Sequence, residues 1–312
     1  MTAFAFVFPG QGSQSPGMLD AFGDHPAVRQ TLAEASDALG QDIGRLIAEG
    51  PKEELDLTTN TQPVMLTAGV ACWRVWLAET GLEPAAVAGH SLGEYTALVA
   101  AGGLSFADAL PLVRFRAQAM QEAVPVGAGG MAAILGLDAE AVRAGCAQAQ
   151  AEVGEVVEAV NFNDPKQTVI AGTAAAVAKA CEVLKAAGAK RALPLPVSAP
   201  FHSSLMKPAA ERLREKLAAT AFQAPRIPVL HNIDVQEARD ADGIRDALYR
   251  QAFGPVRWVE TIQALKGRGL TRVFECGPGK VLAGMVKRID AELVTATVYD
   301  PATVSEVKGL LA

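Results

Sequence analysis

The amino-acid sequence predicts an α/β fold in which a large body is interrupted by a small insert. In the first and last thirds of the 312 residues, short apolar runs typical of buried strands alternate with helical patterns. In the middle third the order of strands and helices changes, and stretches rich in Pro or Gly mark both of its borders. Half of the residues are apolar, so the chain can bury a large core.

The first part of the body alternates strands with helices. Its predicted elements are a strand at 4–8, helices at 26–38 and 63–80, a strand at 85–88, and helices at 92–101 and 105–122. Pro9-Gly10 ends the first strand, and the helix at 63–80 is so apolar that it must be buried. Ser105 followed by Asp108 is typical of a capping box, which marks the start of the last helix. This alternation predicts a mainly parallel sheet covered on both faces.

The insert has an order of elements of its own. Its predicted elements are a strand at 131–137, a helix at 139–151, strands at 156–161 and 167–172, a helix at 174–187 and a strand at 191–197. The order β-α-β-β-α-β is that of a ferredoxin-like unit. We therefore place the insert at 126–198 and the body at 1–125 and 199–312.

The body pattern resumes after the insert. Its predicted elements are a helix at 205–219, a strand at 228–230, helices at 243–251 and 255–267, and a strand at 271–275. A cleft between two such parts is a common place for a ligand. We therefore expect the functional residues where the insert meets the body.

Charge and cysteine content exclude several classes of protein. A formal net charge of -6 argues against nucleic acid or an anionic membrane as the main partner. The four cysteines include no C-x-x-C pair, which favours reduced thiols over a disulfide framework or a zinc site. The N-terminus lacks the positive region of a signal peptide, and the apolar stretch at 64–73 is too short to span a bilayer. We expect a soluble, cytoplasmic protein.

The strongest local signal for chemistry is the motif Gly-His-Ser-Leu-Gly at 89–93. A predicted strand precedes it and a predicted helix follows, so Ser91 would stand on the sharp turn that presents a nucleophilic serine. The N–H groups at the start of that helix could also hold an oxyanion. The alternative is a glycine-flanked turn in which Ser91 only caps the helix.

A nucleophilic serine needs a base, and the chain has four histidines. His90 adjoins Ser91 on the tight turn, so its side chain should point away, and His25 has the pattern of an exposed start of a helix. His202 lies in a turn-rich stretch where the insert rejoins the body. His231 follows an apolar strand, a position that suits a structural histidine equally well. We favour His202 over His231, and no pattern identifies the third group that would orient the base.

A second glycine-rich strand end, at 10–15, has two of the three glycines of a dinucleotide-binding fingerprint. Gly10 and Gly12 fit G-x-G-x-x-G, but Ser15 occupies the third position. A dinucleotide-binding protein is therefore an alternative function. The loop could instead bring backbone N–H groups to the Ser91 turn, as an early loop does in α/β hydrolases. The stretch Gly-Pro-Gly-Lys at 277–280 lacks the spacing of a phosphate-binding loop, so we interpret it as a structural turn.

Two arginines, Arg114 and Arg116, lie on a predicted helix that is otherwise poor in charge. Being two residues apart they point in different directions, so at most one of them faces a given cleft. An arginine turned inward would suit a carboxylate, which its planar fork holds with two hydrogen bonds. The alternative is that both lie on a solvated helix face.

With these residues assembled, the sequence resembles the malonyl-CoA:acyl carrier protein transacylases, an acyltransferase family of bacterial fatty-acid synthesis. The motifs that carry the resemblance are FPGQGSQ at 8–14, GHSLGEY at 89–95, Arg116 with MQ at 120–121, NFN at 161–163, Phe201-His202, Asn232, Gln251 before PV at 255–256, and ECGPG at 275–279. They span essentially the whole chain. The resemblance implies an α/β-hydrolase-like body with a ferredoxin-like insert.

The resemblance also implies roles for individual residues. Ser91 would be the nucleophile and His202 its base and acid, oriented by the main-chain carbonyl of Gln251. The backbone N–H groups of Gln11 and Leu92 would form the oxyanion hole. The remaining roles implied are binding of the malonyl carboxylate by Arg116, lining of the substrate channel by Asn161 and Asn163, and docking of the carrier protein by Lys190 and Arg191.

The implied reaction is ping-pong transfer of malonyl from malonyl-CoA to the pantetheine thiol of holo acyl carrier protein, through a malonyl-serine ester. No metal or redox cofactor is required, and we expect a monomer. The residues before His202, Ala199-Pro200-Phe201, match neither the malonyl nor the methylmalonyl pattern of related polyketide acyltransferases fully. A serine thioesterase and a malonyl loader for a polyketide synthase are the alternatives.

Overall fold

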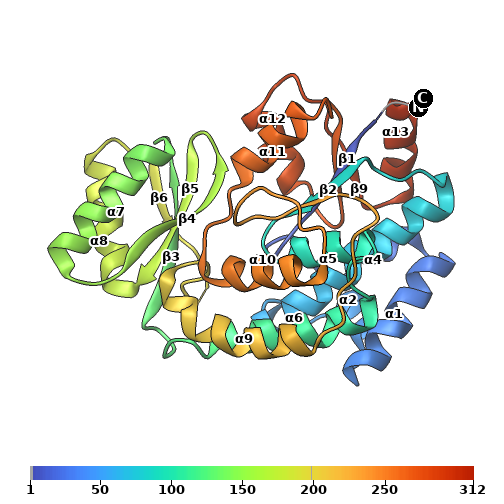
Figure 1. The fold of residues 1–312 in the computed structure, drawn as a ribbon, viewed down its shortest axis with the longest axis horizontal. Coiled ribbons are helices and arrows are strands. Elements are labelled where there is room, and N and C mark those ends of the chain that lie inside the picture. Colours follow the sequence, from blue (N-terminus) through green and yellow to red (C-terminus); the bar gives the residue numbers. More distant parts are fainter. Residues whose placement is uncertain (1–2, 198) are drawn as a thin grey trace.

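The computed structural model describes residues 3–197 and 199–312, which form a body and an insert (Figure 1). The body contains a five-stranded sheet in the order β7-β2-β1-β8-β9, and all its strand pairs are parallel. Its strands are β1 (Ala5–Phe8), β2 (Ala86–Gly89), β7 (Val229–Leu230), β8 (Val273–Cys276) and β9 (Thr297–Val298). The predicted parallel sheet is confirmed.

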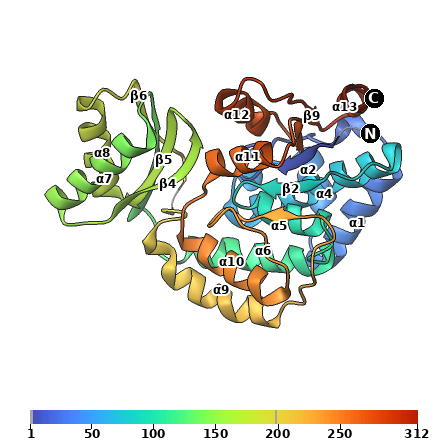
Figure 2. The ribbon, with the colours of Figure 1, turned by 45° about the horizontal axis from the view of Figure 1, so that its top comes forward.

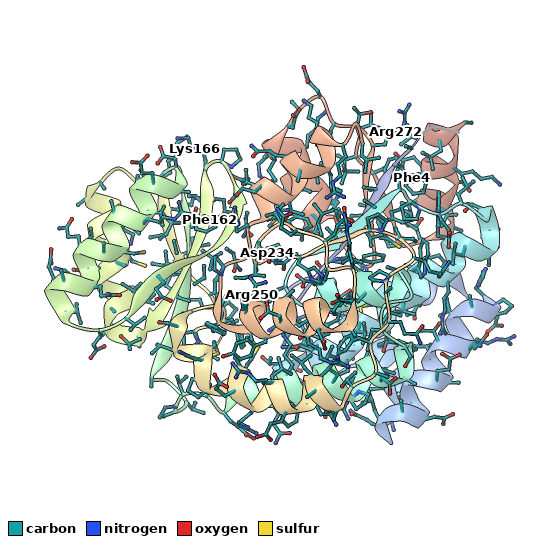
Figure 3. All side chains as sticks on the ribbon, in the orientation of Figure 1. Phe4, Phe162, Lys166, Asp234, Arg250 and Arg272 are labelled. Carbon is teal, nitrogen blue, oxygen red and sulfur yellow. The ribbon has the colours of Figure 1, made fainter. Side chains whose placement is uncertain are left out.

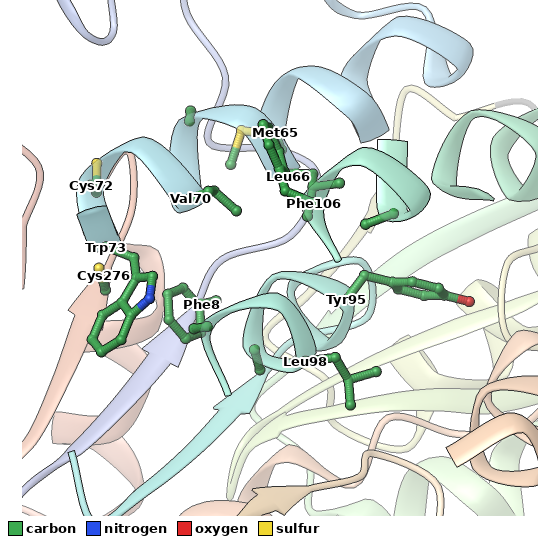
Figure 4. Close-up of a cluster of buried hydrophobic side chains, with 14 of the residues drawn as sticks. Phe8, Met65, Leu66, Val70, Cys72, Trp73, Tyr95, Leu98, Phe106 and Cys276 are labelled. Atoms are coloured by element: carbon green, nitrogen blue, oxygen red, sulfur yellow. The ribbon is translucent and has the colours of Figure 1, made fainter. Parts of the chain in front are cut away.

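Alternate side chains of β1 enter two different cores. Phe6 and Phe8 pack with Trp73 in a large cluster of buried apolar side chains, part of which Figure 4 shows. Val7 points to the opposite face of the sheet, where it joins a second cluster that includes Trp258. Because both faces are covered, β1 consists of apolar residues only, which is why it could be recognised as a buried strand.

Helices cover both faces of the body sheet (Figures 1 and 2). They are α1 (Pro26–Leu39), α2 (Ile43–Glu49), α3 (Lys52–Leu55), α4 (Thr58–Thr80), α5 (Gly93–Ala100), α6 (Phe106–Gln121), α9 (Lys207–Ala219), α10 (Ala241–Phe253), α11 (Trp258–Gly267), α12 (Val281–Ile289) and α13 (Pro301–Leu311), with short 3-10 turns η1 (Asp20–Phe22) and η2 (Ser204–Met206). Ser105 caps α6 as predicted, since its Oγ accepts a hydrogen bond from the N–H of Asp108 at 3.0 Å.

Two helices begin three or more residues away from their predicted start. The apolar helix α4 begins at Thr58 rather than at Pro63, because the carbonyl of Leu57 already accepts from the N–H of Thr61 at 2.8 Å. Pro63 therefore lies inside the helix. The helix predicted at 255–267 begins three residues later, at Trp258, because residues 255–257 run beside the insert instead.

The insert is the predicted ferredoxin-like unit. Its elements are β3 (Gly129–Leu135), α7 (Ala139–Val153), β4 (Val157–Asp164), β5 (Gln167–Thr173), α8 (Ala174–Ala186) and β6 (Arg191–Pro194). The four strands form an antiparallel sheet in the order β4-β5-β3-β6. One face packs against α7 and α8, and residues of the other face, including Met131 and Val160, pack with Phe201 of the body.

The last strand of the insert is shorter than predicted. β6 ends at Pro194 rather than at 197, since Pro194 and Pro196 have no N–H to donate to a neighbouring strand. The predicted end of the insert, Ser198, lies outside the described residues. The exact borders of the insert stay a prediction.

Strand β4 attaches the insert to the body (Figure 2). The N–H of Phe162 donates to the carbonyl of Val256 at 3.0 Å, and the N–H of Val256 donates to the carbonyl of Val160 at 2.8 Å. At the end of the strand, Asp164 forms an ion pair of 2.7 Å with Arg288 of α12. The insert is thus joined to the body by main-chain hydrogen bonds and a charged pair as well as by its two connecting segments.

Within the described part of the chain, no helix combines the length and the apolar character that crossing a bilayer would require.

Candidate active site

Ser91 lies on a sharp turn between β2 and α5. Its φ of 51° is in the left-handed region, which a residue with a side chain adopts at a cost of about 1–2 kcal/mol. The flanking glycines are required by close packing. A Cβ on Gly89 would lie 1.9 Å from the carbonyl group of Gly93, and a Cβ on Gly93 would lie 2.0 Å from the carbonyl oxygen of Phe8. The turn therefore needs this glycine spacing to form at all.

His202 is the histidine that the structure brings to Ser91. Its Nε2 atom lies 2.7 Å from the Ser91 Oγ, and its Nδ1 atom lies 2.9 Å from the main-chain carbonyl oxygen of Gln251. A carbonyl can only accept, so Nδ1 carries the proton and Nε2 is left to accept from the Ser91 hydroxyl. Burial, with the positive charge of Arg116 adding to it, lowers the pKa of His202 to about 3. The imidazole is therefore neutral at physiological pH.

Among the described residues, the other three histidines have their hydrogen bonds with groups other than the Ser91 hydroxyl. His231 is buried and its Nδ1 lies 2.8 Å from a carboxylate oxygen of Glu94, so of the two histidines considered as the base only His202 contacts Ser91. His25 is the N-cap of α1 and accepts from the N–H of Ala27.

His90 points away from the Ser91 hydroxyl, as we expected from the tight turn. Its ring packs edge-on against Trp258 with centroids 5.3 Å apart. Its Nε2 donates to Asn163 Oδ1 at 2.8 Å. Burial lowers the pKa of His90, so this ring is neutral and holds Asn163 in place.

Arg116 is almost fully buried, with 1% of its surface exposed, so the alternative of a solvated helix face is wrong for it. Its Nη1 donates to Gln62 Oε1 at 2.8 Å, and its Nη2 donates to Gln251 Oε1 at 3.1 Å and contacts the Ser91 Oγ at 3.3 Å. All three acceptors are neutral. Since none of these hydrogen-bond partners is an anion, the guanidinium is electrostatically prepared to bind one, although the Glu94 carboxylate also acts on it through space. The burial lowers the pKa of Arg116 from its ordinary value.

Arg114 faces a different way, as the two-residue spacing predicts. Its Nη2 donates to Gln41 at 2.5 Å, and it does not line the cavity at Ser91. Arg116 is thus the arginine of this helix that faces the site.

The loop that carries Gln11 lies directly against the Ser91 turn. A Cβ on Gly10 would lie 2.6 Å from the carbonyl oxygen of His90 and 3.8 Å from the amide nitrogen of Leu92. Gln11 and Leu92 both line the cavity that contains Ser91. The position of this loop agrees with its interpretation as a partner of the turn rather than as a dinucleotide-binding loop.

A cavity of about 130 Å³ is lined by Ser91 together with Gln11, Gln62, His90 and Leu92. Its apolar wall includes Met120, Met131 and Phe201, and its polar wall includes Arg116 and His202. A groove of about 300 Å³ between body and insert shares Gln11, His90, Asn161 and Leu195 with the cavity and reaches α12.

Asn161 and Asn163 of β4 border the groove. Asn161 also lines the cavity, and its Oδ1 is a buried acceptor that has no partner among the described residues. Lys190 and Arg191 lie outside both spaces, exposed at the start of β6.

Two residues in contact with the site were missed from the sequence. Gln62 holds the Arg116 guanidinium but lies in the first turns of α4, which we predicted to begin one residue later. Glu94 was included only as a letter of the motif at 89–95, although it is a fully buried carboxylate. Neither position carries a local signal, because what matters is the side chain that each meets from a distant segment.

Comparison with known proteins gives consistent matches over the full length. The family profile of the acyl transferase domain matches residues 5–293. The malonyl CoA-acyl carrier protein transacylase of Salmonella typhimurium is 54% identical over 306 residues, which are 98% of each chain.

Solved structures agree with these matches. A crystal structure of an acyl-carrier-protein S-malonyltransferase from Burkholderia pseudomallei superposes with a TM-score of 0.96 at 68% identity, covering 98% of this chain and 99% of the other. A malonyl-transacylase in complex with a type II polyketide acyl carrier protein superposes with a TM-score of 0.95 at 50% identity, covering 97% and 98%.

Proposed function

Because this chain belongs to the acyl transferase domain family, we propose here how its residues perform malonyl transfer from malonyl-CoA to acyl carrier protein. This activity, which supplies fatty-acid synthesis, is that of an acyl-carrier-protein S-malonyltransferase. The observation that carries the residue roles is one cluster: the Ser91 Oγ lies 2.7 Å from His202 Nε2 and 3.3 Å from the buried guanidinium of Arg116.

In the first half-reaction Ser91 attacks the thioester carbonyl of malonyl-CoA. His202 Nε2 accepts the hydroxyl proton as the new C–O bond forms, and the carbonyl of Gln251 stabilises the imidazolium through Nδ1–H. The tetrahedral intermediate then breaks its C–S bond, and the CoA sulfur leaves with the proton from Nε2. The products are free CoA and a malonyl-Ser91 ester.

In the second half-reaction the pantetheine thiol of holo acyl carrier protein takes the place of CoA. His202 Nε2 accepts the thiol proton, and the sulfur attacks the ester carbonyl. When the C–O bond to Ser91 breaks, the proton returns to the Ser91 oxygen. The enzyme is restored, and malonyl is linked to the carrier protein as a thioester.

The oxyanion of both intermediates is assigned to the backbone N–H groups of Gln11 and Leu92. Support comes from the close approach of the Gly10 backbone to Leu92 and from the position of both residues in the wall of the cavity. Such donors are fixed before the reaction, so they stabilise the developing charge without reorganising.

Arg116 is assigned to the free carboxylate of malonyl. Gln62 and Gln251 hold the guanidinium at two nitrogens, which fixes its plane. A substrate without the carboxylate, such as acetyl-CoA, would leave this buried charge uncompensated. Burial is the main cause of the lowered pKa of His202, and the charge of Arg116 lowers it further. A bound carboxylate would offset this second contribution, so the base becomes stronger once the correct substrate is present.

The groove is assigned to the pantetheine arm, with Asn161 and Asn163 along its wall. Asn161 Oδ1 has no other partner among the described residues, which suits an acceptor for an amide N–H of the arm. Lys190 and Arg191 are assigned to docking of the acidic carrier protein, on the strength of their charge and exposure at the edge of the insert. We further propose a cytoplasmic location, since four unpaired thiols suit a reducing compartment, and the monomer stays a prediction from the sequence.

Intact-mass analysis after incubation with malonyl-CoA tests this proposal. The wild-type chain is expected to gain the mass of one malonyl group, and Ser91→Ala is expected to gain none. Addition of holo acyl carrier protein should move the group to the carrier. If malonyl-CoA is mainly hydrolysed in the presence of the carrier, the thioesterase alternative is correct instead.

A further inference from the structure

A closed ring of hydrogen bonds lies behind the Ser91 turn. Asn232 accepts from the Ser91 N–H at its Oδ1 (2.7 Å) and donates from its Nδ2 to the carbonyl of Gly89 (2.7 Å). The backbone N–H of Asn232 donates to Glu94 Oε2 (2.8 Å), and the other oxygen of Glu94 accepts from His231 Nδ1 (2.8 Å). Glu94 itself lies in the first turn of α5. Its backbone N–H donates to the carbonyl of Ser91 at 3.1 Å, which closes the ring.

Burial of these polar and charged groups costs free energy of folding. Glu94 and Asn232 are completely buried, and His231 is 1% exposed. A carboxylate is tolerated in such a place only when donors compensate for the lost water, as His231 and the Asn232 N–H do here. Apolar residues of similar size would fill the space without that penalty. The ring therefore calls for a function other than packing.

The ring of hydrogen bonds contacts the turn that sets the backbone conformation of Ser91, the assigned nucleophile. The Ser91 backbone is held at a φ of 51°, which is unfavourable for serine. Asn232 bonds the peptide groups on both sides of His90 and so prevents the turn from relaxing to an ordinary φ. Relaxation would displace the Ser91 Oγ from His202 and rotate the Leu92 N–H that follows it.

The segment that carries Asn232 is itself anchored to the helix that orients the base. Asp234 forms an ion pair of 2.7 Å with Arg250 of α10, and Figure 3 shows the two side chains together. The next residue of α10 is Gln251, whose carbonyl accepts from His202. One helix thus fixes both the histidine and, through Asp234 and Asn232, the serine.

We propose that Asn232 is a positioning residue for Ser91, and that Glu94 and His231 hold it in place. The proposal rests on the role assigned to Ser91. None of the three residues lines the cavity or the groove, so they act on the geometry of the reaction and not on binding of the substrate.

Two substitutions of Asn232 separate its two hydrogen bonds. Asn232→Leu removes both, and Asn232→Asp keeps an oxygen that can accept from the Ser91 N–H but loses the donor to Gly89. Single-turnover malonylation of Ser91, followed by rapid quench and intact mass, is expected to slow roughly tenfold or more in Asn232→Leu and less in Asn232→Asp. The dissociation constant of malonyl-CoA, measured in the Ser91→Ala background, should stay at the value of the parent chain.

Thr31→Val is the matched control for lost stability. Thr31 is a fully buried residue of α1 whose hydroxyl donates to Ala27 and accepts from Arg74, and it lines neither the cavity nor the groove. This variant should lower Tm and leave the malonylation rate unchanged. If Asn232→Leu does not fold, Glu94→Gln takes its place, because the amide can accept only one of the two hydrogen bonds and an intermediate slowing is expected.

The proposal is wrong if a folded Asn232 variant malonylates Ser91 at the wild-type rate, if the slowing comes with weaker binding of malonyl-CoA, or if Thr31→Val slows malonylation equally. Failure of the wild-type chain to form malonyl-Ser91 would instead contradict the proposed function. The two failures are therefore distinguishable in one experiment.

Discussion

The Nη2 atom of Arg116 lies 3.3 Å from the Ser91 Oγ. The group proposed to select the substrate and the proposed nucleophile are therefore within one hydrogen-bond length of each other. Gln251 contacts both the arginine and the histidine, since its side-chain oxygen accepts from Arg116 while its main-chain oxygen accepts from His202. A change at the arginine should accordingly affect both the choice of acyl group and the protonation of the base.

Arg116→Gln should reduce kcat/KM for malonyl transfer roughly 100-fold, because two charge-assisted hydrogen bonds to the carboxylate are lost. Acetyl transfer should change far less, since acetyl has no group for the guanidinium to bind. Steady-state rates with malonyl-CoA and acetyl-CoA measure the ratio. Arg114→Gln, on the same helix but bonded to Gln41, is the matched control and should leave the ratio unchanged. Equal losses with both acyl groups would contradict the assigned role.

The same substitution should change the pH dependence of acetyl transfer. Burial and the charge of Arg116 lower the pKa of His202 to about 3, so the wild-type base stays neutral down to that pH. Removal of the positive charge raises this pKa, and protonation then inactivates the base at a higher pH. The acid limb of the profile of kcat/KM should therefore move to higher pH in Arg116→Gln. An unchanged pH profile would show that the charge of Arg116 does not affect the pKa of His202.

Gln62→Leu should weaken malonyl selectivity without changing the contact between Ser91 and His202. Gln62 accepts from Nη1 of Arg116 and Gln251 accepts from Nη2. Without Gln62, the guanidinium would be held at one of these nitrogens instead of two. We expect kcat/KM for malonyl transfer to fall about tenfold, while acetyl transfer is maintained. Steady-state assays with both acyl-CoA substrates test it, and a similar loss for acetyl would indicate a general disturbance of the cavity.

Glu275 should make stability depend on pH in an unusual direction. Burial raises the pKa of this carboxyl from 4.5 to about 7, although Oε2 accepts from the N–H of Ala283. Between those two values the folded chain binds more protons than the unfolded chain, so this group lowers the free energy of unfolding as pH rises. Glu275→Gln cannot titrate, so its stability relative to wild type should increase from about pH 5 to about pH 8.

Urea denaturation of the two chains at both pH values measures this difference. Glu182→Gln, at an exposed position of α8, is the control and should show no such trend. A constant difference between Glu275→Gln and wild type would mean that the carboxyl titrates normally.

Reversal of the charges at Lys190 and Arg191 should impair only the second half-reaction. The double change to Glu is expected to raise KM for the carrier protein several-fold, with the effect shrinking at high salt because exposed charges are screened. Malonylation of Ser91 by malonyl-CoA should proceed as in wild type. Lys308→Glu, an exposed residue of α13 remote from the insert, is the control (Figure 1). An unchanged KM for the carrier would place docking on another surface.

The parts of the fold that have a local physical cause could be predicted from the sequence. The strand β1, the glycines around Ser91 and the element order of the insert all follow from periodicity or from the conformational demands of single residues. The helices α2 and α3 could not, because four to seven residues are too few for a helical period to show, and the two-residue strand β9 was also missed. The helices α12 and α13 were also missed.

The site shows the same division. Ser91 has a local signature, whereas the contact between Ser91 and His202 joins residues 111 positions apart and exists only once the chain is folded. The group that accepts from His202 Nδ1 is a main-chain carbonyl, which every residue possesses and which therefore leaves no trace in the sequence. The roles of these residues stay predictions until the experiments above are done.

The main-chain hydrogen bonds between β4 and Val256 bear on how this enzyme could be redesigned by substitution. These hydrogen bonds are made by backbone atoms of Val160, Phe162 and Val256, so a change of side chain at a neighbouring position of β4 does not remove them. Side chains that border the groove, such as Asn161, project from the same strand. Asn161, which also lines the cavity, can therefore be substituted while these main-chain bonds remain, which makes this strand a practical starting point for engineering transfer of bulkier acyl groups.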